Sequence, residues 1–425
     1  MYTFASFYRS LTKAWVATVA GGLALSFTHI AAAEPYQSPL FLVAPVKPIT
    51  MLNMSRDHQL YFKLYDDFSD ITDARAMING VANTNYGKDP DGTPDTTYVH
   101  GFNYYGYFDS YKCYQYNATA NQFDPVATTE TKYCNAGTAT NQWSGNFLNW
   151  ASMTRMDAVR KMLYGGMRST DTTTATVLER AYLPTDAHSF AKYYGGSDLP
   201  QLTPFSANIS ADPYTSGLTI CNTSHQGTAT HSQAATSAAG AVPLMRIARG
   251  NYSLWASNER YQCRWAASVS GEDGTNENNA TASLIPAYSG SPIDAHKLGT
   301  GSAAGEFVVR VGVCVNGLIA TSANRDNEKC YAYNSTTAQK TRGLLQVHGG
   351  TQHFGLMTGS YGKNKSGGVL RKGAGSITDE INANGIFQVP SSGFSIIKTL
   401  DLLRIYGYRY SDGLYHNGSH TVHTP

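Results

Sequence analysis

Residues 143–166, WSGNFLNWASMTRMDAVRKMLYGG, carry the clearest helical pattern in this 425-residue sequence. Leu148, Met156 and Leu163 recur at spacings that place them on one face of a single helix. Gly165 and Gly166 follow, and glycine readily adopts the left-handed conformation that ends a helix. The stretch therefore predicts one amphipathic helix that ends at this glycine pair.

Apolar runs that predict β-strands lie on both sides of this helix. Residues 49–52 follow a proline turn and predict a buried strand, residues 307–315 predict a strong strand, and residues 354–358 predict a further buried strand. The aromatic residues of 98–116 alternate with other residue types, which also favours a strand.

Other segments predict further helices and long loops. Helices are expected over residues 176–182, 340–347 and 394–406, whereas residues 206–242 are rich in Ser, Thr, Ala, Gly and Asn and predict loops. Apolar strands that alternate with helices are typical of an α/β fold. We therefore expect an α/β core with long loop and β-rich insertions.

Residues 1–33 have the pattern of a secretory signal peptide. Arg9 and Lys13 form a positive segment, residues 14–30 are almost free of charge, and the small residues 31–33 form a cleavage site. A membrane anchor is the alternative, but glycine and polar residues interrupt the apolar segment. No later apolar run approaches the roughly 20 residues that span a bilayer, so we expect an exported chain with no membrane span after cleavage.

The six cysteines of an exported chain predict disulfides. Six cysteines allow about 15 pairings, and their spacing here favours local pairs. Buried thiols or a metal site are the alternatives, although no Cys-x-x-Cys motif is present. The expected pairs are Cys113 with Cys134, Cys221 with Cys263, and Cys314 with Cys330.

The composition favours a binding protein of the extracellular space. Charged residues make up 15% of the chain, against roughly 25% in an average soluble protein, and 29 tyrosines are present. The formal net charge is +2, and no run of Lys or Arg indicates a nucleic-acid or membrane partner. A neutral, hydrogen-bonding and aromatic surface is therefore expected.

Several unusual stretches occur in a fixed order along the chain. They are residues 104–113 (YYGYFDSYKC), 143–166, 176–188 (TVLERAYLPTDAH), 343–370 (GLLQVHGGTQHFGLMTGSYGKNKSGGVL), 375–381 (GSITDEI) and 403–410 (LRIYGYRY). Together they resemble the N-terminal region of the PilC/PilY family of type IV pilus proteins.

The resemblance implies a von Willebrand A-like α/β domain over residues 34–411. It also implies export to the periplasm, outer cell surface or pilus tip of a Gram-negative bacterium. Roles in pilus assembly, retraction and adhesion would follow, with minor pilins and a host or abiotic surface ligand as partners. Family members usually continue into a β-propeller that carries a calcium site. None is present in this sequence, so residues 412–425 are expected to form a truncated linker.

A first candidate metal site is the loop after the strand predicted at residues 49–52. A von Willebrand A domain holds its metal through Asp-x-Ser-x-Ser at this place, and oxygen ligands on a tight loop suit Mg²⁺ or Ca²⁺. Here the candidate ligands are Asn53, Ser55 and Asp57. Asn53 replaces the leading acid and Arg56 adds a positive charge, so a degenerate site that only shapes the loop is the alternative.

A second candidate calcium site is the turn that contains Asp89, Asp91 and Asp95 around Gly92. Carboxylates and carbonyls in such a turn can bind Ca²⁺, but the spacing differs from that of an EF-hand loop. A solvated turn is the alternative.

The sequence predicts no enzyme. It contains no Gly-x-Ser-x-Gly, P-loop, His-Glu-x-x-His or dinucleotide-binding motif. Asp186 and His188 are close in the sequence, but they more simply brace the turn after Pro184. A secreted hydrolase with a dispersed active site is one rival hypothesis, and an inert structural fragment that lacks its propeller is another.

Overall fold

The computed structural model is mixed α/β and describes most of the chain between residues 46 and 415. The described residues are 46–55, 57–67, 97–135, 140–183, 188–207, 216–224, 242–252, 255, 263, 265, 297–298, 304–319, 327–334, 339–359 and 367–405, with the strands at 77–78, 81–82, 408–409 and 414–415. The expected signal peptide lies outside this part of the chain. The chain divides into two compact units, Met1–Pro48 and Ile49–Pro425, and the second unit contains every element described below.

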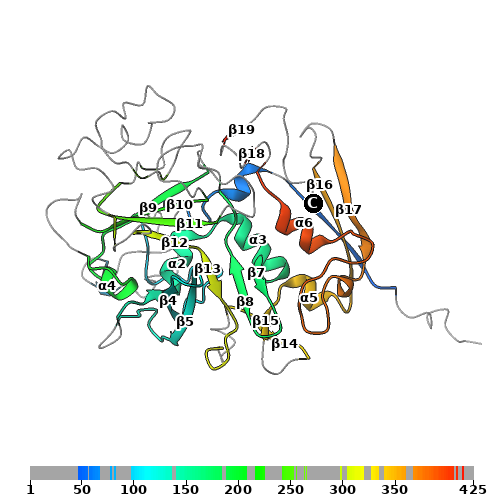
Figure 1. The fold of residues 1–425 in the computed structure, drawn as a ribbon, viewed down its shortest axis with the longest axis horizontal. Helices are drawn as coiled ribbons and strands as arrows, with labels where there is room; N and C mark the ends of the chain where they lie inside the picture. Colours follow the sequence, from blue (N-terminus) through cyan, green and yellow to red (C-terminus); the bar gives the residue numbers. More distant parts are fainter. Residues whose placement is uncertain are drawn as a thin grey trace, which may run out of the picture. The chain divides into compact units, whose positions relative to one another are not determined.

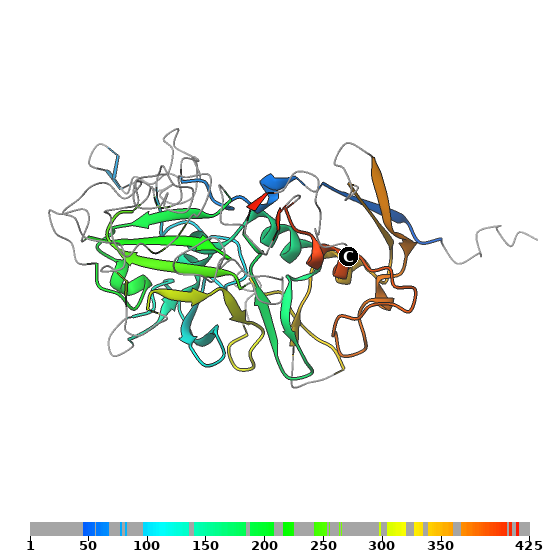
Figure 2. The same ribbon diagram turned by 45° about the horizontal axis from the view of Figure 1, so that its top comes forward.

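A three-stranded sheet joins the two ends of the described chain (Figures 1 and 2). Strand β1 (Ile49–Met54) pairs in parallel with β16 (His353–Gly359), which pairs antiparallel with β17 (Gly368–Gly375). The strands expected at 49–52 and 354–358 are therefore confirmed. Side chains from one face of this sheet share a core with α3 (Arg155–Tyr164) and α6 (Ile396–Leu402).

A second sheet has six strands, in the order β6-β4-β5-β13-β8-β7. Its strands are β4 (Lys112–Asn117), β5 (Gln122–Thr128), β6 (Trp143–Ser144), β7 (Arg168–Asp171), β8 (Thr176–Glu179) and β13 (Arg310–Gly312). All neighbours in it are antiparallel except β13 and β5, which are parallel.

A four-stranded antiparallel sheet shares a core with α2 and α4, in the order β12-β11-β10-β9. Its strands are β9 (Phe190–Tyr194), β10 (Leu218–Thr223), β11 (Leu244–Arg249) and β12 (Glu306–Val308).

Short elements complete the described chain. The helices are α2 (Gly145–Ser152), α4 (Leu199–Leu202) and α5 (Leu344–His348), and the 3₁₀ turns are η1 (His58–Tyr61) and η6 (Ile377–Asp379). The two-stranded ribbons are β14 (Cys330–Ala332) with β15 (Gln339–Thr341), β2 (Met77–Ile78) with β3 (Val81–Ala82), and β18 (Tyr408–Arg409) with β19 (Leu414–Tyr415).

The helix expected over residues 143–166 is two helices, α2 and α3. Thr154 has an extended backbone and caps α3, because its hydroxyl accepts a hydrogen bond from the Asp157 amide while the Asp157 carboxylate accepts one from the Thr154 amide. Such a capping box starts a new helix even where the apolar spacing continues. The predicted stop is confirmed, since Gly165 is left-handed with φ of 89° and its amide donates to the carbonyl of Lys161.

Two other predictions from local pattern are wrong, and a third is confirmed only in part. Residues 176–179 form strand β8 instead of a helix, because β7 and β13 pair with it on both sides and all four residues are buried. Residues 206–242 contain strand β10 within the expected loops. The single strand expected at 307–315 is divided into β12 and β13. Short apolar runs fit either periodicity, so tertiary pairing decides their structure.

The expected strand at 98–116 is mainly irregular before β4 begins at Lys112. Two buried asparagines of α2 provide the hydrogen bonds that a neighbouring strand would otherwise supply. Asn149 accepts from the Phe108 amide at 3.0 Å and donates to the carbonyls of Tyr104 and Phe108, each at 2.8 Å. Asn146 accepts from the Tyr104 amide at 2.9 Å. The aromatic alternation therefore reflects ring packing in the core.

All three expected disulfides are present. Cys113 bonds to Cys134, Cys221 to Cys263, and Cys314 to Cys330, across sequence separations of 21, 42 and 16 residues. Each crosslink lies within one local region of the chain, as the spacing predicts.

Candidate binding and metal sites

The loop after β1 shows what its expected metal ligands do. Asn53, Ser55 and Asp57 are all exposed. The Ser55 hydroxyl accepts a hydrogen bond from the Asp57 amide at 2.9 Å, and the Asp57 carboxylate accepts one from the Gln59 amide at 2.9 Å. Asp57 is thus the N-cap of η1. One of its oxygens is already used in shaping the loop, and this arrangement requires no ion.

The second candidate loop, with Asp89, Asp91 and Asp95, lies outside the described residues. Within them, one group of acidic, His and Cys side chains is close enough to hold a metal ion, namely Cys314, Glu328 and Cys330. The two cysteines form a disulfide, so their sulfurs are not thiolate ligands. This group is therefore a structural cluster.

His188, considered above with Asp186, instead meets a residue from the start of the chain. Its Nε2 lies 3.1 Å from Nδ1 of His58, and Asp186 is outside the described residues. His188 is buried and its ring packs against Phe62. These contacts connect η1 to the segment before β9.

The outer face of the three-stranded sheet carries four exposed apolar side chains, together with the polar Asn53 opposite Met357. Alternate residues of β1 point away from the core, and Ile49 and Met51 are 64% and 42% exposed. Met357 of β16 is 37% exposed and Leu370, its partner on β17, is 54% exposed. The sequence predicted that this strand is buried, whereas only its other face, with Leu52 and the side chains beside it, packs on the core. We call Ile49, Met51, Met357 and Leu370 the apolar sheet face.

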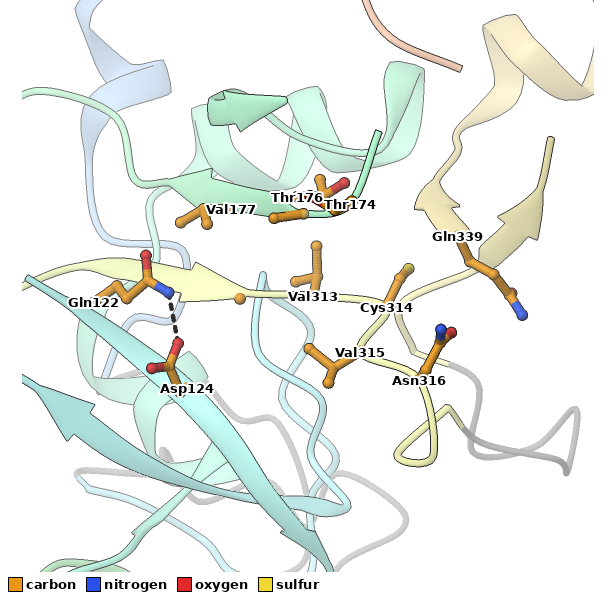
Figure 3. A pocket seen from close by; sticks show the side chains of 12 residues that line it. Gln122, Asp124, Thr174, Thr176, Val177, Val313, Cys314, Val315, Asn316 and Gln339 are labelled. Carbon is orange, nitrogen blue, oxygen red and sulfur yellow. Dashed lines mark hydrogen bonds between the residues drawn. The ribbon is translucent and has the colours of Figure 1, made fainter. Parts of the chain in front are cut away.

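A small pocket opens where β13 ends between β5 and β8 (Figure 3). Beyond Gly312 the chain leaves β5, and the Val313 amide donates to the carbonyl of Thr176 at 3.0 Å. The cavity measures about 310 Å³. In Figure 3 the Asp124 side chain approaches from β5, and Thr174 and Thr176 lie on the β8 side.

A buried ion pair supports one wall of this pocket. Nζ of Lys112 lies 2.8 Å from Oε2 of Glu328, and both side chains are almost fully buried. The same Glu328 oxygen accepts a hydrogen bond from the Cys314 amide at 3.0 Å. Burial raises the pKa of the Glu328 carboxyl, and the ammonium of Lys112 opposes this shift. The pair therefore fixes Cys314, which lines the pocket and is crosslinked to Cys330.

Sequence reasoning missed both the apolar sheet face and the pocket. The residues of β1, Ile-Thr-Met-Leu-Asn-Met, place apolar side chains on both faces of the strand, so their pattern does not indicate which face is exposed. The sequence does not mark Asp124 as a pocket residue, because a polar residue in an alternating strand usually faces solvent. Only the divergence of β13 from β5 places it beside a cavity.

No helix within the described ranges has the length and apolar character needed to cross a bilayer. This statement covers α2, α3, α4, α5 and α6, the longest of which, α3, contains 10 residues.

Comparison with known proteins adds a family assignment. A family model described as the small alpha/beta domain of PilY1 homologs matches residues 95–247, and one described as the second domain of PilY1 homologs matches residues 354–424. The first match covers α2, α3, α4 and β4 to β10, and it ends within β11. The second begins within β16, so β1 completes a sheet whose other strands belong mostly to the second match.

Two curated relatives come from Xylella fastidiosa (strain Temecula1), and each is named a type IV pilus biogenesis factor PilY1 homolog. One is 31% identical over 382 residues, which cover 86% of this chain and 22% of the relative. The other is 44% identical over 94 residues, which cover 20% of this chain and 8% of the relative. The chain therefore spans about a fifth of the length of the first relative. No solved structure matches it.

The alpha/beta description of the first family model agrees with the architecture described above. The chain belongs to the PilY1-like family of type IV pilus biogenesis proteins.

Proposed function

We propose that this protein acts in the assembly and retraction of type IV pili, and in surface adhesion, by binding partners and not by catalysis. It works after export, in the periplasm, at the cell surface or at the pilus tip. Its partners are minor pilins together with a host or abiotic surface ligand. The relatives' name, type IV pilus biogenesis factor, supports the pilus role. The three disulfides fit an oxidising compartment.

The apolar sheet face is the observation that best supports a binding role. A group of neighbouring apolar side chains that are exposed to solvent often marks an interaction site. The face belongs to a sheet in which β1 and β17 are edge strands among the described residues, so unpaired backbone groups border it. We assign this face to a minor pilin. An apolar patch with an open strand edge suits a partner that contributes an extended segment with alternating apolar side chains.

The test is retention of minor pilins by the purified protein. We expect the soluble domain of at least one minor pilin from the same organism to bind the wild-type protein. The double variant Met51→Glu, Leu370→Glu should lose at least tenfold in affinity, because two carboxylates would be desolvated at the centre of the contact.

A matched control replaces an exposed apolar side chain outside this face by glutamate. Val126 of β5 is 40% exposed and lies in the six-stranded sheet, so Val126→Glu should bind pilin as the wild type does. All variants should keep the wild-type melting temperature. If no minor pilin is retained by the wild type, the inert-fragment hypothesis is favoured instead.

As a further part of this proposal, the fold around β1 and β16 is similar to that of von Willebrand A domains. This similarity is supported by the parallel pairing of β1 with β16, by helices on one face of that sheet, and by the position of Ser55 and Asp57 just after β1. Ca²⁺ or Mg²⁺ binding at Asn53, Ser55 and Asp57, or at Asp89, Asp91 and Asp95, would raise the melting temperature. Equal melting curves with 5 mM EDTA and with about 5 mM of each ion would count against both sites.

A further inference from the structure

The pocket at the end of β13 lies beside Gly312, at the place where β13 and β5 separate. Pairing between β13 and β5 is limited to Val311 opposite Phe123. Gly312 follows, and a Cβ built on it would lie 3.4 Å from Oδ1 of Asp124 and 3.5 Å from Cδ of Pro125. Gly312 does not have the positive φ that requires glycine. A methyl group here would therefore make ordinary van der Waals contact with both atoms and would occupy the space beside the Asp124 carboxylate, which faces the cavity (Figure 3).

Asp124 is held in place but retains the capacity to bind. Its Oδ1 accepts a hydrogen bond from Nε2 of Gln122 at 2.5 Å, and its Oδ2 accepts one from Nδ2 of Asn117 at 3.0 Å. An ionised carboxylate has about four acceptor sites. The two neutral amides fix the orientation of the group, and about two acceptor sites are left for a ligand.

The remaining polar groups around the cavity are uncharged amides and hydroxyls. They are Gln122, Thr174, Thr176, Asn316 and Gln339. Val177 and Val313 supply apolar surface between them. No Lys or Arg lines the cavity, which disfavours an anionic ligand, and a single carboxylate is a poor site for Ca²⁺, which takes about 6–8 oxygen ligands. The lining instead matches a neutral ligand that both donates and accepts hydrogen bonds.

We propose that this pocket binds one neutral sugar residue through its hydroxyl groups. Asp124 accepts hydrogen bonds from two ring hydroxyls, the amides of Gln122 and Gln339 supply donors and acceptors, and Val177 and Val313 contact the C–H face of the ring. The volume of about 310 Å³ is at the lower end of ligand sites, which suits one compact ring better than an extended peptide. The inference extends the proposed adhesive function by naming a ligand class for it.

The test is saturation-transfer NMR on the purified protein with glucose, galactose, mannose and N-acetylglucosamine, each titrated separately. At least one sugar should bind the wild type. Asp124→Asn should weaken that binding at least tenfold, because it removes the anionic acceptor. Gly312→Ala should do the same by filling the space beside Oδ1, although it leaves every hydrogen bond of the pocket intact.

Two matched variants control for charge and for the loss of glycine. Glu130 is an exposed carboxylate outside the pocket, and Glu130→Ala should bind sugar as the wild type does. Gly373 of β17 is exposed with open space around its Cβ position, so Gly373→Ala should also be silent. Equal melting temperatures of all four variants would show that folding is unaffected.

The inference is overturned if no sugar binds the wild type, or if binding survives both pocket variants. Purified protein is used because sugar binding then does not depend on pilus assembly. Normal piliation and retraction in a strain that lacks this protein would instead overturn the proposed function. That result would leave a positive sugar titration standing.

Discussion

At the scale of single residues, buried polar side chains decide the local backbone of this protein. The segment before β4 has no strand partner among the described residues, yet its amides and carbonyls are bonded to Asn146 and Asn149. Because a buried backbone group without a partner is costly, two side chains here replace a strand ladder.

Asn149→Ala tests this replacement directly. The change removes the side-chain partner of the Phe108 amide and carbonyl, in a region where both Asn149 and Phe108 are fully buried, whereas the Tyr104 carbonyl keeps its hydrogen bond from the Ser110 hydroxyl. We expect the free energy of unfolding to fall by at least about 2 kcal/mol, since each of these two unpaired buried groups costs about 1–3 kcal/mol. Urea denaturation measures this. The exposed Asn53→Ala should change it by less than about 0.5 kcal/mol, and an equal loss in both variants would contradict the argument.

Lys192 makes the free energy of unfolding change with pH in the alkaline range. Burial lowers the pKa of its ammonium from 10.5 to about 8, although the Asp67 carboxylate, at 2.8 Å, opposes the shift. Below pH 8 the folded and unfolded chains both carry this proton. Between pH 8 and 10.5 only the unfolded chain carries it, so the contribution of Lys192 to the free energy of unfolding rises with pH.

The comparison with Lys192→Met isolates that contribution. The difference in unfolding free energy, wild type minus variant, should become more positive between pH 8 and 10, by up to about 1.4 kcal/mol per pH unit. Chemical denaturation at several pH values measures it. A difference that is flat or falls with pH would show that Lys192 keeps its proton in the folded protein.

At the scale of elements, one capping box decides where α3 begins. The Thr154 hydroxyl donates to Oδ2 of Asp157 at 2.7 Å and accepts from the Asp157 amide, and Oδ1 of Asp157 accepts from the Ala181 amide at 2.7 Å. The cap therefore also connects α3 to the chain that follows β8. Thr154 and Asp157 are fully buried, so these bonds are shielded from water.

Thr154→Val should destabilise the protein by about 1–2 kcal/mol. It preserves the shape of the side chain but removes the hydroxyl that caps the first turn of α3. Thr154→Ser keeps the hydroxyl and should lose less than half as much. Thermal or urea unfolding of the two variants measures the difference, and similar losses for both would assign the effect to methyl packing instead of the cap.

At the scale of the whole molecule, three crosslinks act on three separate regions. The Cys113–Cys134 bond reaches the segment after β5, the Cys221–Cys263 bond reaches Trp255 and Trp265 beyond β11, and the Cys314–Cys330 bond closes the chain beside the pocket. In the chain-entropy model a crosslink stabilises more when it closes a longer loop.

The three bonds should therefore differ in their contribution to stability. Replacing Cys221 and Cys263 together by alanine should cost about 4 kcal/mol, and replacing Cys314 and Cys330 should cost about 3 kcal/mol, because the separations are 42 and 16 residues. Melting temperatures of the two double variants, measured without reductant, give the order. A larger loss for the Cys314 and Cys330 variant would mean that strain release or contacts of Glu328 outweigh loop entropy.

The sequence by itself determined the features that depend on neighbours along the chain. Local cysteine spacing correctly paired all six residues, Gly165 ended α3, and the apolar runs at β1 and β16 became strands. The family resemblance also came from local stretches in order, and the comparisons confirm it.

Only the tertiary structure decided which faces are covered and which segments are paired. Residues 176–179 became a strand because β7 and β13 flank them, and the outer side of β1 stayed exposed because helices cover only one face of its sheet. The pocket beside Asp124 exists because β13 leaves β5 after Gly312. Each outcome depends on contacts between residues far apart in sequence, whose free energy a local pattern does not contain.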